Sequence, residues 1–484
     1  MRETIISSAK EKIFSGILWK FSERILTQMM SFIVSVILSR ILMTEDYGAV
    51  AMVNIFISIA DIFITSGFST SLIQKKDATS VDFSTIFYCS FIASILLYGL
   101  LFVTAPLIAQ FYGMPALTNI IRIFSLRLLL SAYNSVQHAY VSRKMIFKRF
   151  FFSTLFGTLL SGIVGIAMAY QGFGVWALIA QYFVNSIVDT AVLAITVKWY
   201  PRLQFSWKSA LKLMNYGCKV LATDLSGNIF NKLRPLLIGK RYSLVDLAYY
   251  DKGTNISSLL SSNIFTSVTS VMFPAFSNEN DNIERVKNMF RKSIQILSFL
   301  IFPLLGGCIA VAHQFILVIF TEKWAECIFF VRVLCLIPCI ELTGHLSIQG
   351  LKATNNAGTL LRNEVISKPF YVICLIFGCI ISLKALALSM VIASAMGSFI
   401  NTHSFAKIIK YKCAELASDL KASFAMTLIM AGTISLLNLI HASNHILLLI
   451  QIPCGIVIYV MLSIITKNDS FIYLIKQIKG KLGT

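Results

Sequence analysis

The sequence predicts an all-α integral membrane protein with about fourteen transmembrane helices, arranged as two pseudo-symmetric six-helix lobes plus two C-terminal helices. Three observations predict this fold class. Hydrophobic residues make up 57% of the 484-residue chain and charged residues only 13%, with a mean hydropathy of +0.77. The apolar residues form runs of membrane-spanning length, and most basic residues lie in alternate gaps between them. This composition excludes a soluble globular protein.

The expected spans are long apolar segments, because about 20 apolar residues in an α-helix cross the hydrocarbon core. Helices are expected because backbone groups in lipid must find hydrogen-bond partners within their own segment. On the fifth span, small residues at every fourth position indicate close helix packing: Gly157, Ser161, Gly165 and Ala169. The spans expected are 15–42, 48–70, 84–108, 116–139, 151–170, 174–197, 215–238, 248–275, 293–319, 327–350, 363–382, 386–406, 422–440 and 445–466.

The basic residues predict the orientation of these spans. Of the 42 Lys and Arg residues, 27 lie in the N-terminal tail and the even-numbered gaps, and 4 lie in the odd-numbered gaps. Basic residues are enriched in cytoplasmic loops, so both termini are expected on the cytoplasmic side. The net charge of +20 therefore reflects membrane topology and attraction to anionic inner-leaflet lipid, and it does not indicate nucleic-acid binding.

A weak internal repeat predicts the division into lobes. Ile37-Leu38-Ser39-Arg40 with Asp46 matches Leu237-Ile238-Gly239-Lys240 with Asp246 at a constant offset of 200 residues. We expect an N-lobe at 1–200, a C-lobe at 201–412, and two further spans with a cytoplasmic tail at 413–484. An even number of spans in each lobe gives both lobes the same orientation, with a cavity between them.

Eleven basic residues lie inside the expected spans, where each buried charge costs at least about 2.5–3.5 kcal/mol. Residues that costly are expected to face a wet cavity or a partner. Four of them lie deep on polar helix faces without an acidic residue one turn away: Arg24, Arg127, Lys219 and Arg234. Amides on the same or similar faces complete the candidate substrate-binding set: Gln28, Asn54, Asn134, Asn228 and Asn255. The alternative for the uncharged residues is hydrogen bonding between helices.

Acidic residues inside the spans have two possible roles. Asp61, Asp189 and Asp224 could bind a coupling ion, or they could neutralise the nearby cations, and the sequence does not decide between these roles. The ten cysteines are scattered and form no CxxC motif, so neither a metal site nor a disulfide framework is expected. We find no set of residues that indicates catalysis. A cavity lined by cations, hydroxyls and amides is suited to an anionic, sugar-rich substrate.

Several short motifs resemble those of a known family. They include Ile37-Leu38-Ser39-Arg40-Ile41-Leu42 with Glu45-Asp46-Tyr47-Gly48, the segment 67–76, Gly174-Val175-Trp176-Ala177-Leu178, and Phe273-Pro274-Ala275-Phe276-Ser277. From about residue 14 to 465 the sequence resembles the Wzx/WzxC-type polysaccharide exporters, which are lipid-linked oligosaccharide flippases of the MOP superfamily. Each motif is weak alone, and they are specific only as a set.

The resemblance implies a V-shaped, fourteen-helix transporter in a bacterial inner membrane. Its substrate would be an undecaprenyl-diphosphate-linked repeat unit of O-antigen, capsule or exopolysaccharide, moved to the periplasmic face by alternating access. The resemblance also implies coupling to a proton or sodium gradient and no bound cofactor. A polysaccharide polymerase and a chain-length regulator are the partners it implies, besides membrane lipid.

Two other functions stay open. A multidrug antiporter of the same superfamily would share the two lobes, although a cationic cavity counts against a cationic drug. A membrane polysaccharide polymerase or ligase would be an enzyme, and such enzymes need a substantial outer loop for their site. Every odd-numbered gap here is short, and none holds a convergent acid, base and nucleophile. We therefore expect a transporter that is not an enzyme.

Overall fold

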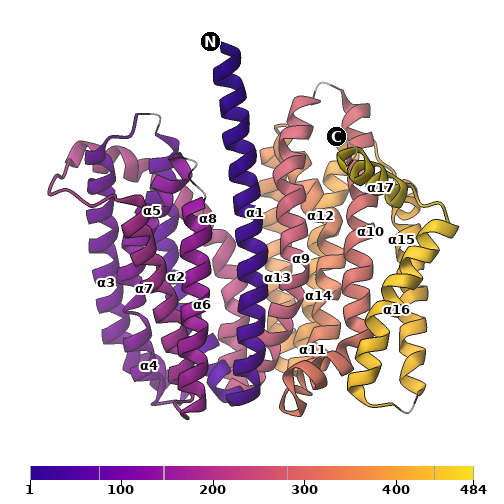
Figure 1. The fold of residues 1–484 in the computed structure, drawn as a ribbon, viewed down its shortest axis with the longest axis horizontal. Helices are drawn as coiled ribbons and strands as arrows, with labels where there is room; N and C mark the ends of the chain where they lie inside the picture. Colours follow the sequence, from indigo (N-terminus) through magenta and orange to yellow (C-terminus); the bar gives the residue numbers. More distant parts are fainter. Residues whose placement is uncertain are drawn as a thin grey trace. The chain divides into compact units, whose positions relative to one another are not determined.

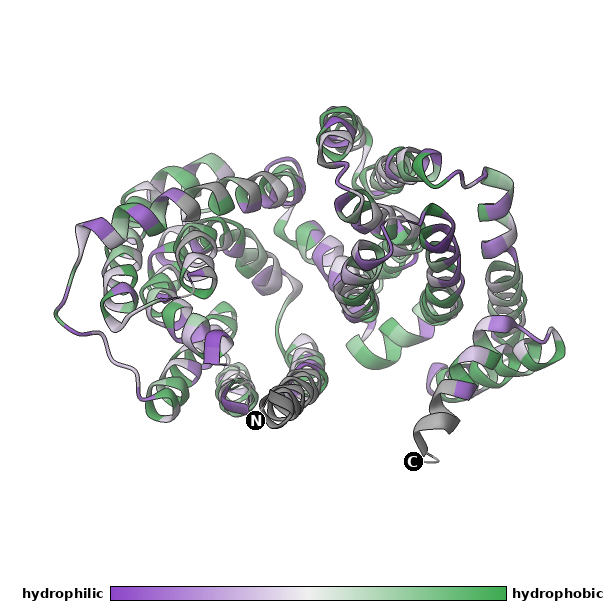
Figure 2. Ribbon diagram, turned by 90° about the horizontal axis from the view of Figure 1, so that it is seen from above, coloured by the Kyte–Doolittle hydropathy of each residue, from purple (hydrophilic) through white to green (hydrophobic). Residues whose placement is uncertain are grey.

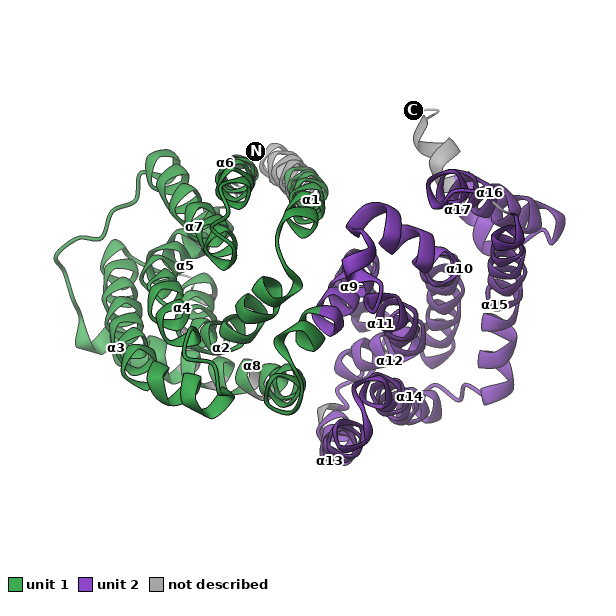
Figure 3. Cartoon of the chain, turned by 90° about the horizontal axis from the view of Figure 1, so that it is seen from below, with its two compact units in different colours: residues 1–248 green, residues 249–484 purple. Residues whose placement is uncertain are grey.

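The chain folds almost entirely into α-helices (Figure 1). The computed structural model describes residues 2–75, 77–144, 146, 148–280, 282–440 and 442–482, and these ranges contain no strand. They form two compact units, unit 1 at residues 1–248 and unit 2 at residues 249–484 (Figure 3). The lobe boundaries predicted at residues 200 and 412 stay predictions.

Unit 1 is a bundle of eight helices and the beginning of a ninth among the residues described. These helices are α1 (Arg2–Ile41), α2 (Thr44–Gln74), α3 (Ser80–Tyr112), α4 (Leu117–Phe124), α5 (Arg127–Lys144), α6 (Lys148–Tyr170), α7 (Val175–Val197), α8 (Trp207–Arg241) and α9 (Leu244–Asn278). Within the unit, α2 packs against α5 and α8, while α6 packs between α1 and α7.

Unit 2 contains the rest of α9 and the remaining helices. These are α10 (Ile283–Phe315), α11 (Cys327–Leu334), α12 (Leu336–Ala353), α13 (Ala357–Ile381), α14 (Leu383–Ile408), α15 (Cys413–Leu436), α16 (Asn444–Ile465) and α17 (Asp469–Leu482). Here α10 packs against α12 and α15, and α14 packs against α12 and α13.

Twelve helical segments in the described ranges are long and apolar enough to cross a membrane. Figure 2 shows hydrophobic residues along the helices of both units. The two expected spans outside these twelve correspond to α4 with α5, and to α8, which carry several basic and polar residues. The predicted all-α membrane fold of about fourteen helices is therefore confirmed, with these two as its most polar members.

The internal repeat is visible in a broken helix that occurs twice. In unit 1, an 8-residue α4 is followed by an 18-residue α5, and in unit 2 an 8-residue α11 is followed by an 18-residue α12. The repeated aspartates also have the same role. Asp46 accepts a hydrogen bond from the Met43 backbone at the start of α2, and Asp246 accepts one from the Ser243 backbone at the start of α9. The repeat thus has a structural basis.

The small residues of α6 allow the close packing predicted for them. A Cβ atom on Gly165 would lie 3.1 Å from Gln181 Cβ of α7, and one on Gly157 would lie 3.3 Å from the Asn185 carbonyl oxygen. On the other side of α6, a Cβ on Gly162 would lie 2.6 Å from a Val34 methyl group of α1. The glycines therefore set the position of α7, which carries part of the candidate site.

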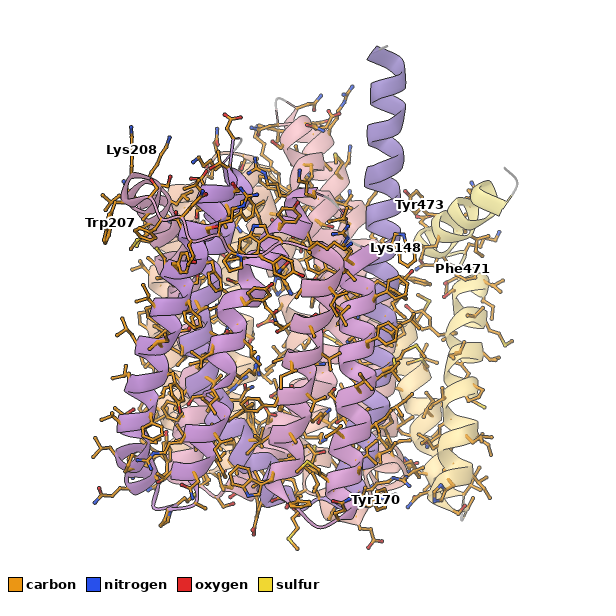
Figure 4. All side chains as sticks on the ribbon, turned by 60° about the vertical axis from the view of Figure 1, so that its left-hand side comes forward. Lys148, Tyr170, Trp207, Lys208, Phe471 and Tyr473 are labelled. Atoms are coloured by element: carbon orange, nitrogen blue, oxygen red, sulfur yellow. The ribbon has the colours of Figure 1, made fainter. Side chains whose placement is uncertain are left out.

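Labelled side chains mark the two ends of the unit 1 bundle. Figure 4 places Lys148, Trp207 and Lys208 toward one end and Tyr170 toward the other. The basic residues at the first end belong to gaps that the charge pattern assigns to the cytoplasm. Their location at one end of the bundle agrees with the prediction that basic residues lie in alternate gaps between the spans of this unit.

Candidate functional site

A polar cavity lies inside unit 1, between helices α2, α5 and α7. Its volume is about 390 Å³. We call it the unit 1 cavity. Four residues of the predicted site line it: Asp61, Arg127, Asn134 and Asp189. Hydroxyls and amides supply much of the remaining lining, including Thr65, Ser69, Ser131, Ser135, Asn185 and Ser186. Such a polar lining is unusual inside membrane-spanning helices, where polar groups are costly and mark solute or ion pathways.

Arg127 occupies the break between α4 and α5. It is the first residue of α5, directly after the turn at Ser125 and Leu126. Its guanidinium carbon lies 5.9 Å from the centre of the Phe124 ring and 5.8 Å from that of Tyr182. Aromatic faces attract a guanidinium, so these rings hold the cation at the cavity wall while its N–H groups can still donate to a ligand.

Asp189 is the polar centre of the cavity. Its Oδ2 accepts a hydrogen bond from Asn134 Nδ2 at 3.3 Å and lies 3.4 Å from His138 Nε2. The Asp189 side chain is only 17% exposed, whereas that of His138 is 49% exposed. Asp189 on α7 therefore ties together two residues of α5 that lie one helical turn apart.

Two oxygen atoms in the cavity wall lack a hydrogen-bond donor. Asp61 Oδ1 and Asn134 Oδ1 are buried and accept no hydrogen bond from the residues that the structure describes. A buried acceptor without a donor costs roughly 1–3 kcal/mol. Both atoms belong to residues of the cavity lining, so small side-chain movements would let a hydroxyl-rich solute supply the missing donors.

The charges of the unit 1 cavity differ from the cationic excess expected of the whole site. Among the lining residues that the structure describes, Arg127 is the only Lys or Arg, and Asp61 and Asp189 oppose it. This balance is better matched to an uncharged, hydroxyl-bearing group than to a diphosphate, which requires several cationic donors.

Seven other predicted residues lie outside this lining. Within the described part of unit 1, Arg24 and Gln28 are on α1, Asn54 is on α2, and Asp224, Asn228 and Arg234 are on α8. Lys219 is also on α8, but its side chain lies outside the described part of the structure. In unit 2, Asn255 on α9 donates a hydrogen bond to Asp251 Oδ2 at 2.8 Å. The structure thus brings together four of the twelve predicted residues.

Two residues of the cavity are absent from the predicted site. His138 belongs to the same polar face of α5 as Arg127 and Asn134. Asn185 lies four positions before Asp189 on α7, which is the spacing of neighbours on one helix face. This spacing is the signal in the sequence that indicates Asn185.

Comparison with known proteins identifies the family. A family model described as polysaccharide biosynthesis protein matches residues 37–329, which is more than half of the chain. The chain belongs to this family. The match begins near the end of α1 and includes all the residues of the unit 1 cavity named above.

Related proteins agree with membership of the polysaccharide biosynthesis family. The succinoglycan biosynthesis transport protein ExoT of Rhizobium meliloti (strain 1021) is 25% identical over 308 residues, which are 63% of this chain and 62% of that protein. The lipopolysaccharide biosynthesis protein WzxC of Escherichia coli (strain K12) is 23% identical over 345 residues, covering 70% of this chain and 69% of WzxC. The teichuronic acid biosynthesis protein TuaB of Bacillus subtilis (strain 168) is 26% identical, with 59% of its length matched. The chain thus spans about three fifths of ExoT and TuaB.

Solved structures show the same fold. The lipid II flippase MurJ in an inward closed conformation has a TM-score of 0.77 at 16% identity, covering 94% of this chain and 99% of MurJ. An inward-facing multidrug resistance transporter of the MATE family has a TM-score of 0.61 at 13% identity, covering 79% of this chain and 94% of that chain. At these identities the likeness concerns the fold alone.

Proposed function

We propose that this protein is a flippase for a lipid-linked oligosaccharide, specifically an undecaprenyl-diphosphate-linked repeat unit of O-antigen, capsule or exopolysaccharide. Movement would run from the cytoplasmic to the periplasmic face of a bacterial inner membrane, by alternating access of the two lobes. Both termini would lie in the cytoplasm. A polysaccharide polymerase and a chain-length regulator would act on or with the exported product.

The observation that carries this proposal is the unit 1 cavity. It places amides, hydroxyls, carboxylates and an arginine between the polar helix α5 and the apolar helices α2 and α7. Sugars present many hydroxyl donors and acceptors, and this mixed lining offers partners for both. Membership of a polysaccharide biosynthesis family supports a glycan as the solute.

The charged parts of the substrate would be bound by other residues. In this proposal Arg24, Lys219 and Arg234 bind the diphosphate, because several cationic donors are needed for its charge. The glycan occupies the polar cavity, and the polyprenyl chain remains in lipid. Asp61, Asp189 or Asp224 would bind the coupling ion, a proton or sodium, whose release lets the lobes change conformation.

A deletion strain tests the proposal directly. Surface polysaccharide should be lost, and complete lipid-linked repeat units should accumulate on the cytoplasmic face of the inner membrane. Expression of the wild-type protein should restore export. Repeat units that reach the periplasmic face but stay unpolymerised would instead indicate the polymerase function and would contradict a flippase.

One observation favours a second candidate, the multidrug antiporter. The unit 1 cavity holds two carboxylates against one arginine, and carboxylates attract organic cations. Expression in a drug-sensitive host separates the two candidates. Resistance to cationic dyes that is lost in Asp61→Asn and Asp189→Asn, together with unchanged surface polysaccharide in the deletion strain, would replace the flippase proposal.

A further inference from the structure

A second cavity opens on unit 2, between α12, α14 and the start of α15. Its volume is about 740 Å³, which falls in the range of ~300–1,000 Å³ typical of ligand sites. We call it the unit 2 groove. Its walls are largely apolar and include Ile340, Ala395, Phe399, Ala406 and Leu416. Phe399 leaves 60% of its surface exposed, so the groove offers substantial apolar area to a ligand.

The polar residues beneath the groove already have partners. Thr343 Oγ1 and Ser398 Oγ lie 3.2 Å apart, and Thr402 Oγ1 donates to Thr343 Oγ1 at 3.1 Å. Ser398 also donates to the Ile340 carbonyl at 2.8 Å. The floor therefore does not require a polar ligand, and the part of the ligand inside the groove is expected to be apolar.

The edge of the groove is basic. Lys407 near the end of α14 and Lys412 just before α15 both line it and are exposed. Neither forms an ion pair with a residue in the described ranges, and none of the lining residues that the structure describes is acidic. Both lysines belong to a gap that the charge pattern assigns to the cytoplasmic side.

The acidic residues nearest to this edge are held by another helix. Asp419 of α15 accepts hydrogen bonds from Arg291 Nε at 2.8 Å and Arg291 Nη2 at 2.9 Å. Glu415 lies 2.9 Å from Lys287 Nζ. Both basic partners are on α10, and Glu415 Oε2 also accepts a hydrogen bond from the Lys412 backbone N–H at 2.8 Å. Glu415 therefore lies beside the basic edge, but its charge is paired with Lys287 and not with the side chain of Lys407 or Lys412.

One wall of the groove is fixed by the same contacts. The Tyr411 hydroxyl donates to Asp419 Oδ2 at 2.7 Å, and Lys287 donates to the Lys410 carbonyl at 3.1 Å. These bonds hold the short connection between α14 and α15 against α10. The groove is therefore a preformed feature of unit 2, with an apolar interior and a basic edge.

We propose that the unit 2 groove binds an anionic phospholipid of the inner leaflet. One acyl chain lies along the apolar walls, and the phosphate contacts Lys407 and Lys412. An anionic head group complements the basic edge, as it does in other basic pockets between membrane helices. A zwitterionic lipid gains less, because none of the described lining residues is acidic and Glu415 beside the edge is already paired with Lys287.

Native mass spectrometry of the purified full-length protein tests this site. The probes are phosphatidylglycerol, phosphatidylcholine and a polyprenyl monophosphate, each added to delipidated protein. The variant Lys407→Ala/Lys412→Ala should lose roughly 10- to 30-fold of its affinity for phosphatidylglycerol, because each lysine near a phosphate contributes a factor of about five. The matched control is Lys208→Ala/Lys212→Ala, which removes two exposed lysines from unit 1 and should leave this affinity unchanged.

A second variant tests the apolar part. Ala395→Phe should fill the groove and reduce phosphatidylglycerol binding without changing any charge. Equal losses of phosphatidylglycerol affinity in Lys407→Ala/Lys412→Ala and in the control Lys208→Ala/Lys212→Ala would contradict a defined site. Equal binding of phosphatidylcholine and phosphatidylglycerol would also contradict it. Preferential binding of the polyprenyl phosphate, with displacement of phosphatidylglycerol, would show that the groove is part of the substrate path instead. None of these readouts depends on transport, so failure of the flippase proposal would leave the result intact.

Discussion

Equivalent pairs of helices, α5 with α7 in unit 1 and α12 with α14 in unit 2, have different roles. In unit 1, Asn134 of α5 binds Asp189 of α7 at 3.3 Å. In unit 2, the hydroxyl oxygens of Thr343 on α12 and Ser398 on α14 lie 3.2 Å apart. Thr343 follows Asn134 by 209 positions, and Ser398 follows Asp189 by the same number. The repeat has kept the contact between these helices while the chemistry of the pair has changed.

The difference lies in the size and charge of the paired side chains. In unit 1, an aspartate, an amide and a histidine line an open polar cavity with unpaired oxygen atoms. In unit 2, small hydroxyl groups bond to one another and to the backbone, which satisfies them. Unit 1 is therefore equipped to bind a polar solute through this helix pair, whereas unit 2 uses the equivalent pair to hold its helices together.

The largest expected effect on export comes from removing the arginines proposed to bind the diphosphate. Arg24→Ala and Arg234→Ala should each abolish polysaccharide export, because Arg127, the one arginine of the described cavity lining, cannot bind a diphosphate alone. Surface polysaccharide, measured at equal protein level in a deletion strain, reports the effect. Lys384→Ala in unit 2, which removes an exposed cation 3.8 Å from Glu326, should export normally. Full export by both arginine variants would remove these residues from the site.

A direct comparison of the equivalent residues comes next. Asp189→Ala should reduce export roughly 10- to 100-fold, because hydrogen bonds to a charged group contribute about 1.5–3 kcal/mol. Ser398→Ala should reduce it by less than about twofold, since its hydroxyl serves only the packing of α12 on α14. The rate of polysaccharide export at matched expression measures both. Equal effects of the two substitutions would remove the distinction between the units.

A smaller effect is expected from misplacing α7. Gly165→Leu should lower export several-fold, because the new side chain must displace Gln181 of α7 and with it Asn185 and Asp189. Gly99→Leu is the control, since a Cβ there meets no atom within 4 Å. Export at equal protein level should separate the two variants. Similar export by both would show that the position of α7 is not critical for the site.

The smallest effect on transport is expected in unit 2. Arg291→Ala removes two donors from the buried Asp419 and should lower stability by about 1–3 kcal/mol. Arg285→Ala breaks a pair that is largely exposed, with Arg285 68% exposed, and should cost less than about 1 kcal/mol. Thermal unfolding in detergent compares them, and export should persist in both. Loss of export with unchanged stability in Arg291→Ala would assign unit 2 a direct role.

Much of the fold could be predicted from the sequence, because apolar length and basic gaps determine where helices can cross a membrane. The expected span 116–139 is nevertheless two helices, broken at Ser125 and Leu126. Hydropathy does not reveal that break, since both sides of it contain apolar residues. The break matters for function, because it places Arg127 at the beginning of α5.

The site was predicted only in part for a different reason. Periodicity shows which residues share a face of one helix, but it does not show which helices bring their polar faces together. Asp61 lies on α2, Arg127 and Asn134 lie on α5, and Asp189 lies on α7, and tertiary packing joins these three polar faces at one cavity. That packing depends on glycine contacts such as Gly165 with Gln181, whose partner residue is not visible in the sequence pattern.

The most direct test of the polar cavity is translocation of a purified lipid-linked oligosaccharide across proteoliposomes. Wild-type protein and Ser398→Ala should move the oligosaccharide to the opposite leaflet, and Asp189→Ala should be at least about 10-fold slower. Translocation by Asp189→Ala at the wild-type rate would contradict a role of the unit 1 cavity in binding the glycan.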